Sequence, residues 1–314
     1  MPLNWFRKAA REPGWMAVSI ADEDIGFVHG QFMPKSRPVV HRCALQRIEA
    51  VGSVEAGFKD ESLGRYDCVT LLKPGDYQML LVEAPNVPRE ELRSAIRWRV
   101  KELLDYHVED AMIDVLDIPP PAETPGRAHS MFAVAARNEV IQNTIRRFEQ
   151  AQVPLSVIDI PETAQRNVAA LYEEEGRAIA LLYFDSAEGL LTINYRTELY
   201  MARRIDIGVA QIAGASDSDA QAELLGRVLL EVQRTFDHFE RQYPEVGISA
   251  LLLAPEPRES GLLDYLADNL GLPVRSVDLQ EVIEFDRDAK LDVAQQWRLF
   301  HLVGTSLRYE MKVL

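Results

Sequence analysis

Strand and helix patterns follow one another in the same order twice along this chain, which leaves few folds open to it. The second half begins with the wholly apolar run 178–184 (AIALLYF), and further strand patterns follow at 190–195 and 199–205. A long helical pattern with an apolar stripe comes next, before a buried strand at 248–253 and a helix at 262–270. Short apolar strands that alternate with helices are typical of α/β proteins.

The first half repeats this order of three strands, a helix, a strand and a helix. After its opening strand patterns come a helix at 139–150, a strand at 155–160 and a helix that begins at Pro161, where proline suits the first turn. The acidic stretch EEEG separates the two series. We therefore expect two duplicated α/β domains with mixed sheets, at residues 1–175 and 176–314.

An insertion of about residues 66–135 interrupts the first half. It contains an amphipathic helix that starts near Pro88, with Glu90 and Glu91 in its first turn, where negative charge meets the helix dipole. Trp98 falls on the polar face of this helix. We expect Trp98 to pack against a neighbouring element, and the alternative is that it contacts a partner.

Composition indicates a soluble globular protein, because 47% of the residues are apolar and 26% are charged. Thirty-four basic residues against 49 acidic ones give a net charge of −15, which argues against nucleic acid or anionic lipid as the main partner. The chain has no signal-peptide pattern and no run of about 18 apolar residues, so we expect no transmembrane segment. Its two cysteines form no CxxC pair, which fits a reducing compartment such as the cytoplasm.

Motifs for catalysis or metal binding are missing from the sequence. The six histidines show no HxxxH or HExxH spacing, and no Cys/His cluster of the zinc type occurs. No P-loop, Gly-x-Ser-x-Gly elbow or GxGxxG follows a strand pattern. We therefore expect no catalytic residues and no metal site.

Several phrases resemble the PilM family of type IV pilus assembly proteins, and the closest likeness is to its members in mannose-sensitive haemagglutinin (MSHA) pilus systems. The likeness covers most of residues 15–278. Two of the phrases are specific to the family and two recur among actin-like proteins; in order, they are VPREELRSAIRWRVKELLDYHVEDAMIDV, MFAVAARNEVIQNTIRRFEQAQVPLSVIDIPETA, EVQRTFDHFERQYP and GLLDYLADNLGLPV.

The resemblance implies an actin-like (ribonuclease H-like) ATPase fold with an inserted subdomain similar to that of the cell-division protein FtsA. It also implies a cytoplasmic protein held at the inner membrane by the cytoplasmic tail of a single-pass, PilN-like membrane protein. Other pilus platform proteins or motor ATPases are further implied partners. ATP with Mg²⁺ is the cofactor that the fold implies.

Nucleotide-binding relatives hold phosphates on two glycine-bearing β-hairpins, and the first of these departs from the pattern here. A family sequence like DIGSSS is replaced by Ser19–Ile20–Ala21–Asp22–Glu23–Asp24, so that Ser19 and Ala21 stand where an acidic residue and a glycine are usual. Asp22 and the two acidic residues after it place carboxylates where phosphate oxygens would lie. Like charges at about 4 Å repel by roughly 1 kcal/mol in water and by more when partly desolvated.

The second hairpin and the adenosine turn depart from the pattern too. Asp185 stays in place, but the hairpin turn is shorter and carries a further carboxylate, Glu188. In the adenosine turn, Pro255 and Glu256 stand where glycines would let the nucleotide approach. We therefore predict a degenerate nucleotide site with no cofactor, and ATP with Mg²⁺ remains the alternative.

These observations favour a non-catalytic scaffold that captures the tail of a PilN-like protein through the inserted subdomain. A short peptide would bind in a groove beside the helix near Pro88, and we expect Arg93, Arg97 and Trp98 to lie near it. The alternatives are an ATP-binding switch or weak ATPase, in pilus assembly or type II secretion, and a self-assembling strand of the kind that actin relatives form.

Overall fold

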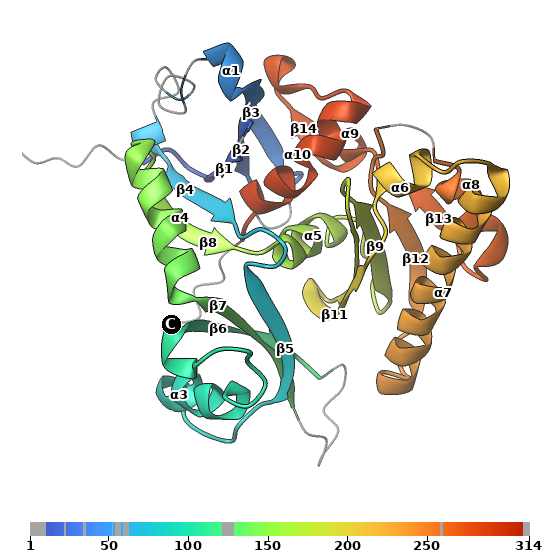
Figure 1. Cartoon of the computed structure of the whole chain (residues 1–314), viewed down its shortest axis with the longest axis horizontal. Helices are drawn as coiled ribbons and strands as arrows, with labels where there is room; N and C mark the ends of the chain where they lie inside the picture. Colours follow the sequence, from blue (N-terminus) through green and yellow to red (C-terminus); the bar gives the residue numbers. More distant parts are fainter. Residues whose placement is uncertain are drawn as a thin grey trace, which may run out of the picture.

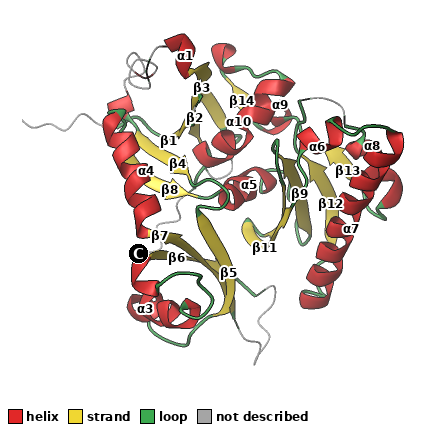
Figure 2. Ribbon diagram, viewed as in Figure 1, coloured by secondary structure: helices red, strands yellow, loops and turns green. Residues whose placement is uncertain are grey.

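A computed structural model describes residues 11–309, apart from 22, 34–35, 52, 54–57, 59–62, 121–128 and 258–259. Its described strands form sheets of six, five and three strands. Figure 1 and Figure 2 show the two larger sheets side by side with helices between them, and the three-stranded sheet below the first. Among the described helices, none is both long and apolar enough to cross a membrane.

The six-stranded sheet is built mainly from the first half of the chain. Its strand order is β14-β3-β2-β1-β4-β8, in which β1, β2 and β3 form an antiparallel meander while β4 and β8 run parallel to β1. Two short helical segments, α1 (Ile48–Val51) and η1 (Leu63–Arg65), lie between β3 and β4 in sequence. The strands are β1 (Trp15–Ile20), β2 (Asp24–Gln31), β3 (Val39–Arg47), β4 (Asp67–Leu71), β8 (Leu155–Asp159) and β14 (Glu284–Phe285).

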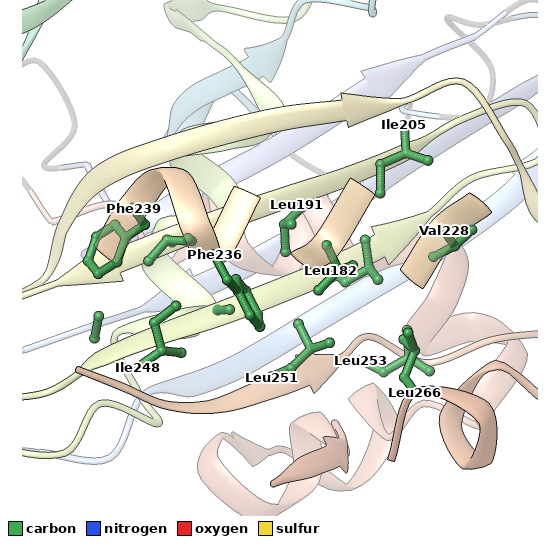
Figure 3. Close-up of a cluster of buried hydrophobic side chains, with 14 of the residues drawn as sticks. Leu182, Leu191, Ile205, Val228, Phe236, Phe239, Ile248, Leu251, Leu253 and Leu266 are labelled. Carbon is green, nitrogen blue, oxygen red and sulfur yellow. The ribbon is translucent and has the colours of Figure 1, made fainter. Parts of the chain in front are cut away.

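The five-stranded sheet has the same plan, with strand order β11-β10-β9-β12-β13. Its central strand β9 is buried throughout, as its apolar sequence predicts. The long helix α7 (Ser218–Gln242) covers one face, and Figure 3 shows its Val228, Phe236 and Phe239 packed among the strands' side chains. The elements are β9 (Ala178–Phe184), β10 (Gly189–Tyr195), β11 (Glu198–Ile205), α6 (Val209–Ala213), β12 (Ile248–Leu253), α8 (Leu262–Asn269) and β13 (Val274–Ser276).

Two helices lie between these sheets and contact each other (Figure 1): α5 (Pro161–Ala169) and α10 (Val293–Ser306). Helix α10 packs on the first sheet, whereas α5 packs on β9, β10 and β11 of the second. One apolar cluster runs from Ala17 of β1 through Val303 of α10 to Leu181 of β9. The two halves therefore share a continuous core.

Close contact between these helices depends on Gly304. A Cβ atom at this position would lie 2.3 Å from the backbone oxygen of Ala164. The Nδ2 atom of Asn167 donates a hydrogen bond of 2.9 Å to the Gly304 carbonyl and fixes the pair in register. Only a residue without a side chain allows this approach.

The inserted subdomain is an antiparallel sheet of strand order β5-β7-β6, with helix α3 (Arg89–Val100) on one face. Ile96 and Val100 of α3 are fully buried against this face, which confirms the amphipathic pattern. Helix α4 (Asn138–Gln150) leads from the subdomain back to the first sheet. The strands are β5 (Tyr77–Glu83), β6 (Ala111–Ile118) and β7 (Ser130–Arg137), and a short helix η2 (Val108–Asp110) precedes β6.

Two details of the expected organisation differ in the structure. Strand β4 was expected inside the insertion of residues 66–135, but it pairs in parallel with β1 in the six-stranded sheet. Strand β14 and helix α10 come from residues 176–314, yet β14 pairs with β3 and α10 packs on the first sheet. The segments α9 (Leu279–Val282) and η3 (Arg287–Ala289) flank β14 in sequence. The division at residue 175 itself stays a prediction.

We predict that Gly304→Ala destabilises the protein by about 1–3 kcal/mol, because the added methyl group forces α5 and α10 apart. Urea unfolding followed by circular dichroism gives the change in the free energy of unfolding. Gly247→Ala is the matched control, since a Cβ atom there meets no heavy atom within 4 Å. Equal effects of the two substitutions would contradict a close helix contact at Gly304.

Candidate functional site

The first candidate loop joins β1 to β2, and its backbone is engaged within the protein. Ser19 pairs with Gly26 in the strand ladder, and the Ala21 amide donates a hydrogen bond of 2.8 Å to the Asp24 carbonyl. The Ala21 carbonyl accepts one from Arg147 of α4. Asp22 lies outside the described residues.

Asp24, the last carboxylate of this loop, is paired with a cation of the same chain. Its Oδ2 atom lies 2.5 Å from Nη2 of Arg298 on α10. The preceding residue of α10, Trp297, donates its indole N–H to the carbonyl of Phe184 at the end of β9. Helix α10 thus touches both hairpins where a nucleotide-binding relative would hold phosphates.

The second loop joins β9 to β10, and its amides point to its own aspartate. Oδ1 of Asp185 accepts hydrogen bonds of 2.7 Å from the amides of Ala187 and Glu188. The Asp185 amide in turn donates to the Glu188 carbonyl, which closes the turn. Two N–H groups that a phosphate would need are therefore occupied by a carboxylate.

Glu188 belongs to an ion network that the sequence did not predict. It pairs with Arg204 of β11, and Nη2 of Arg204 also lies 2.8 Å from Oε1 of Glu162 at the start of α5. The hydroxyl of Tyr77 donates a hydrogen bond of 2.5 Å to the same Glu162 carboxylate. Nearby, burial and, to a lesser extent, the charge of Arg204 lower the pKa of His301 to about 3, so this ring is neutral at pH 7.

The turn after β12 is the third candidate loop. Pro255 has no amide to donate, and burial raises the pKa of Glu256, whose carboxylate accepts hydrogen bonds of 2.8 and 3.0 Å from the Ser260 hydroxyl. Arg258 and Glu259 lie outside the described residues. A pocket of about 700 Å³ opens beside the turn, and Glu256, Asp264 and Asp278 give its lining three carboxylates.

The three residues expected near a partner groove have different surroundings. Arg97 is internal: it donates hydrogen bonds of 2.6 and 3.2 Å to the carbonyls of Val108 and Ala111 and so holds η2 against α3. Arg93 forms an exposed pair with Asp114 at 3.1 Å. Trp98 is 75% exposed, so the expectation that it packs against a neighbouring element is wrong; the ammonium group of Lys101, from the same helical segment, lies over its ring.

A groove of about 580 Å³ lies on the other side of the inserted subdomain. Residues 115–117 of β6 form one wall, and the end of α5, the β10–β11 turn and residues 307–309 form the others. Strand β6 is an edge strand within the described sheet, and its residues 115–117 line this groove. The sequence predicted strand β6, but its alternation of apolar and polar residues did not show that β6 lies at the edge of the described sheet.

Charges around the groove are largely neutralised within the protein. Arg166 lies 3.6 Å from Glu198, and burial raises the pKa of this glutamate against the opposing effect of Arg166. Oδ1 of Asp117 lies 2.6 Å from Nε2 of His129, a contact that is an ion pair only when the ring is protonated. Arg308 pairs with Asp159. Arg166 and Arg308 of the groove lining are thus both paired within the protein.

Comparison with solved structures identifies the class of fold. One match is to the PilM–PilN type IV pilus biogenesis complex, with a TM-score of 0.73 and 18% identity over 94% of this chain and 97% of that one. A second, looser match is to the cytoplasmic domain of EpsL, an inner-membrane component of the type II secretion system of Vibrio cholerae. It has a TM-score of 0.44 and 16% identity over 92% and 94% of the two chains.

The chain has the actin-like fold, as the resemblance implied. A protein of Bacteroides thetaiotaomicron described as having an actin-like ATPase fold also matches, with 8% identity, a TM-score of 0.46 and 86% and 92% of the two chains covered. No protein-family model matches the chain. No curated protein matches it in sequence.

We predict that substitutions at two neighbouring positions of α3 differ in their effect on stability. Arg97→Met keeps the aliphatic stem but removes hydrogen bonds from a charged donor, so it should cost about 1.5–3 kcal/mol of stability. Trp98→Ala should change stability by less than about 0.5 kcal/mol, because the indole is mostly in solvent. Denaturant unfolding measures both, and a larger loss for Trp98→Ala would contradict the exposed position of its ring.

Proposed function

We propose that this protein is a scaffold of the type IV pilus assembly platform and binds the cytoplasmic tail of a PilN-like inner-membrane protein. The observation that carries the proposal is the structural match to the PilM–PilN complex, which extends over nearly the whole of both chains. The bound tail places the protein in the cytoplasm at the inner membrane. An MSHA-type pilus is the proposed system, on the strength of the family phrases in the sequence.

The groove beside β6 is the proposed site for the tail. It has the size of a small-ligand pocket, an edge strand along one wall and apolar side chains such as Leu116 and Leu171 in its lining. An extended peptide can add to an unpaired strand edge and place alternate side chains in pockets. The exposed face of α3, with Arg93 and Trp98, lies on the opposite face of the subdomain sheet and is the alternative site.

The proposed scaffold works without nucleotide. Amides of the second hairpin are bonded to Asp185, and Arg204 and Arg298 neutralise carboxylates of the two hairpins internally. A phosphate group would have to displace these contacts and approach the remaining acidic groups. This arrangement supports a degenerate site, and an ATP-binding switch or weak ATPase is the competing hypothesis.

We predict that a synthetic peptide of the PilN-like tail binds the protein and that Ala170→Arg weakens this binding at least about tenfold, or 1.4 kcal/mol. Ala170 lines the groove at the end of α5, so a long charged side chain would fill the space that the peptide needs. Calorimetric titration measures the affinity. Ala267→Arg, at an exposed position of α8, is the matched control.

Trp98→Ala completes this experiment. Unchanged affinity is expected, since Trp98 lies outside the groove lining. If Trp98→Ala abolished binding while Ala170→Arg did not, the tail site would move to the face of α3. If the wild-type protein bound no tail peptide at all, the scaffold proposal would fail.

We predict that millimolar Mg-ATP neither releases heat nor raises the melting temperature. A ligand present at about 100 times its Kd stabilises a protein by roughly 2.7 kcal/mol, which a thermal scan detects readily. A nucleotide-binding actin-like protein in the same buffer serves as the positive control. A saturable titration with this chain would favour the ATP-binding switch.

A further inference from the structure

Four side chains from separate parts of the fold meet in one network: Tyr77, Glu162, Glu188 and Arg204. Tyr77 belongs to the inserted subdomain, Glu162 to α5, Glu188 to the β9–β10 turn of the second sheet and Arg204 to its strand β11. Arg204 is the centre, because its guanidinium contacts the other three groups.

Each contact in the network is a charge-assisted hydrogen bond. Nη2 of Arg204 lies 2.8 Å from Oε1 of Glu162 and 2.5 Å from the Tyr77 hydroxyl, and Nη1 donates to Glu188. The Tyr77 hydroxyl donates to Oε2 of Glu162 at 2.5 Å. Glu162 therefore has a partner for each oxygen, and Tyr77 joins the subdomain to both ions.

Because the Glu162 carboxylate is buried, it depends on its contacts with both Arg204 and Tyr77. The Glu162 side chain is only 2% exposed, and a carboxylate so removed from water is stable only while it is paired. Burial, followed by the neighbouring Glu162 charge, raises the pKa of Tyr77, which keeps its hydroxyl protonated and able to donate. Glu162 thus requires that the second sheet and the subdomain both stay in place beside α5.

Glu188 of the network lies in the β9–β10 hairpin, which holds phosphate in nucleotide-binding relatives. The cation that pairs with Glu188 is Arg204, a residue of the same chain. We propose that Arg204 is an internal counter-ion that fixes the second sheet, α5 and the inserted subdomain in the arrangement seen here and that this arrangement requires no nucleotide. The groove beside β6 is then formed before its partner arrives. This last step rests on the proposed function, whereas the fixed arrangement does not.

The walls of the groove come from the elements that the network joins. Helix α5 carries Glu162 at its start and the groove residues Arg166 and Ala170 one and two turns later. Strand β11 carries Arg204 and begins at Glu198, another groove residue. Strand β5, with Tyr77, pairs with β7, which pairs with the wall strand β6. Loosening the network would therefore change the shape of the groove.

The test compares Arg204→Met with Arg203→Met. Arg203 is the neighbouring residue of β11, but it is 55% exposed and pairs with Glu231 of α7, on the other face of the sheet. Spin labels at the exposed positions Ser94 on α3 and Glu240 on α7 report the distance between the subdomain and the second half. Cys43 and Cys68 are first replaced by alanine.

In the free protein we expect a narrow distance distribution for the unsubstituted chain and for Arg203→Met, and a broad or shifted one for Arg204→Met. Mg-ATP should leave all three unchanged. Tyr77→Phe, which keeps the ion pairs but releases the subdomain, should broaden the distribution without unfolding the chain and serves if Arg204→Met does not fold. A narrow, unshifted distribution for Tyr77→Phe and for any folded Arg204→Met would overturn the proposal.

Affinity for the tail peptide is measured separately on the same variants. We expect a loss on the order of tenfold for Arg204→Met and little change for Arg203→Met, in the range of coupling between linked sites. If the distances change but no variant binds a tail, the counter-ion role stands and the proposed function fails. If the distances change and affinity does not, the network fixes the domains but does not shape the groove.

Discussion

The contact between α5 and α10 is the constraint on which the rest of this structure depends. Gly304 brings the backbones of the two helices together, and each helix then packs on a different sheet. Because α10 comes from the end of the chain and packs on strands from its beginning, neither half completes its core alone. The positions of Trp297 and Arg298, and hence their contacts with the two hairpins, follow from the same packing.

Electrostatic balance at the two hairpins follows from this arrangement. In an acidic chain, carboxylates gathered at two facing hairpins would repel one another as well as any phosphate. Here Arg298 lies against Asp24, and Arg204 lies between Glu162 and Glu188, so residues of the chain itself compensate these carboxylates. If the loops bind no nucleotide, as we propose, the two arginines supply the positive charge that the carboxylates beside them need.

Local sequence patterns predicted which segments form helices and strands better than they predicted which segments contact one another. The apolar run 178–184 is β9, and the acidic start and apolar stripe near Pro88 mark α3. Strand β4 was assigned to the insertion because its parallel pairing with β1 bridges about fifty residues and leaves no periodic signal. The departures of the three loops from the family pattern were visible as substitutions, but Arg204 was not, since it lies 42 residues from Glu162 and looks like any charged residue near a strand end. Trp98 was misjudged because periodicity shows which face a residue occupies and not what covers that face.

A rigid groove beside β6 would affect how the protein recognises a flexible tail. A disordered peptide loses conformational freedom on binding, and a receptor that must also order its own site adds to that cost. The groove beside β6 has walls from the subdomain, α5 and the β10–β11 turn, and each of these is held by contacts elsewhere in the fold. The entropic cost of binding would then fall on the peptide alone. An actin-like protein whose parts are held together by its own ion pairs, as we propose here, would be suited to hold a partner continuously, whereas one that depends on nucleotide would be suited to release it.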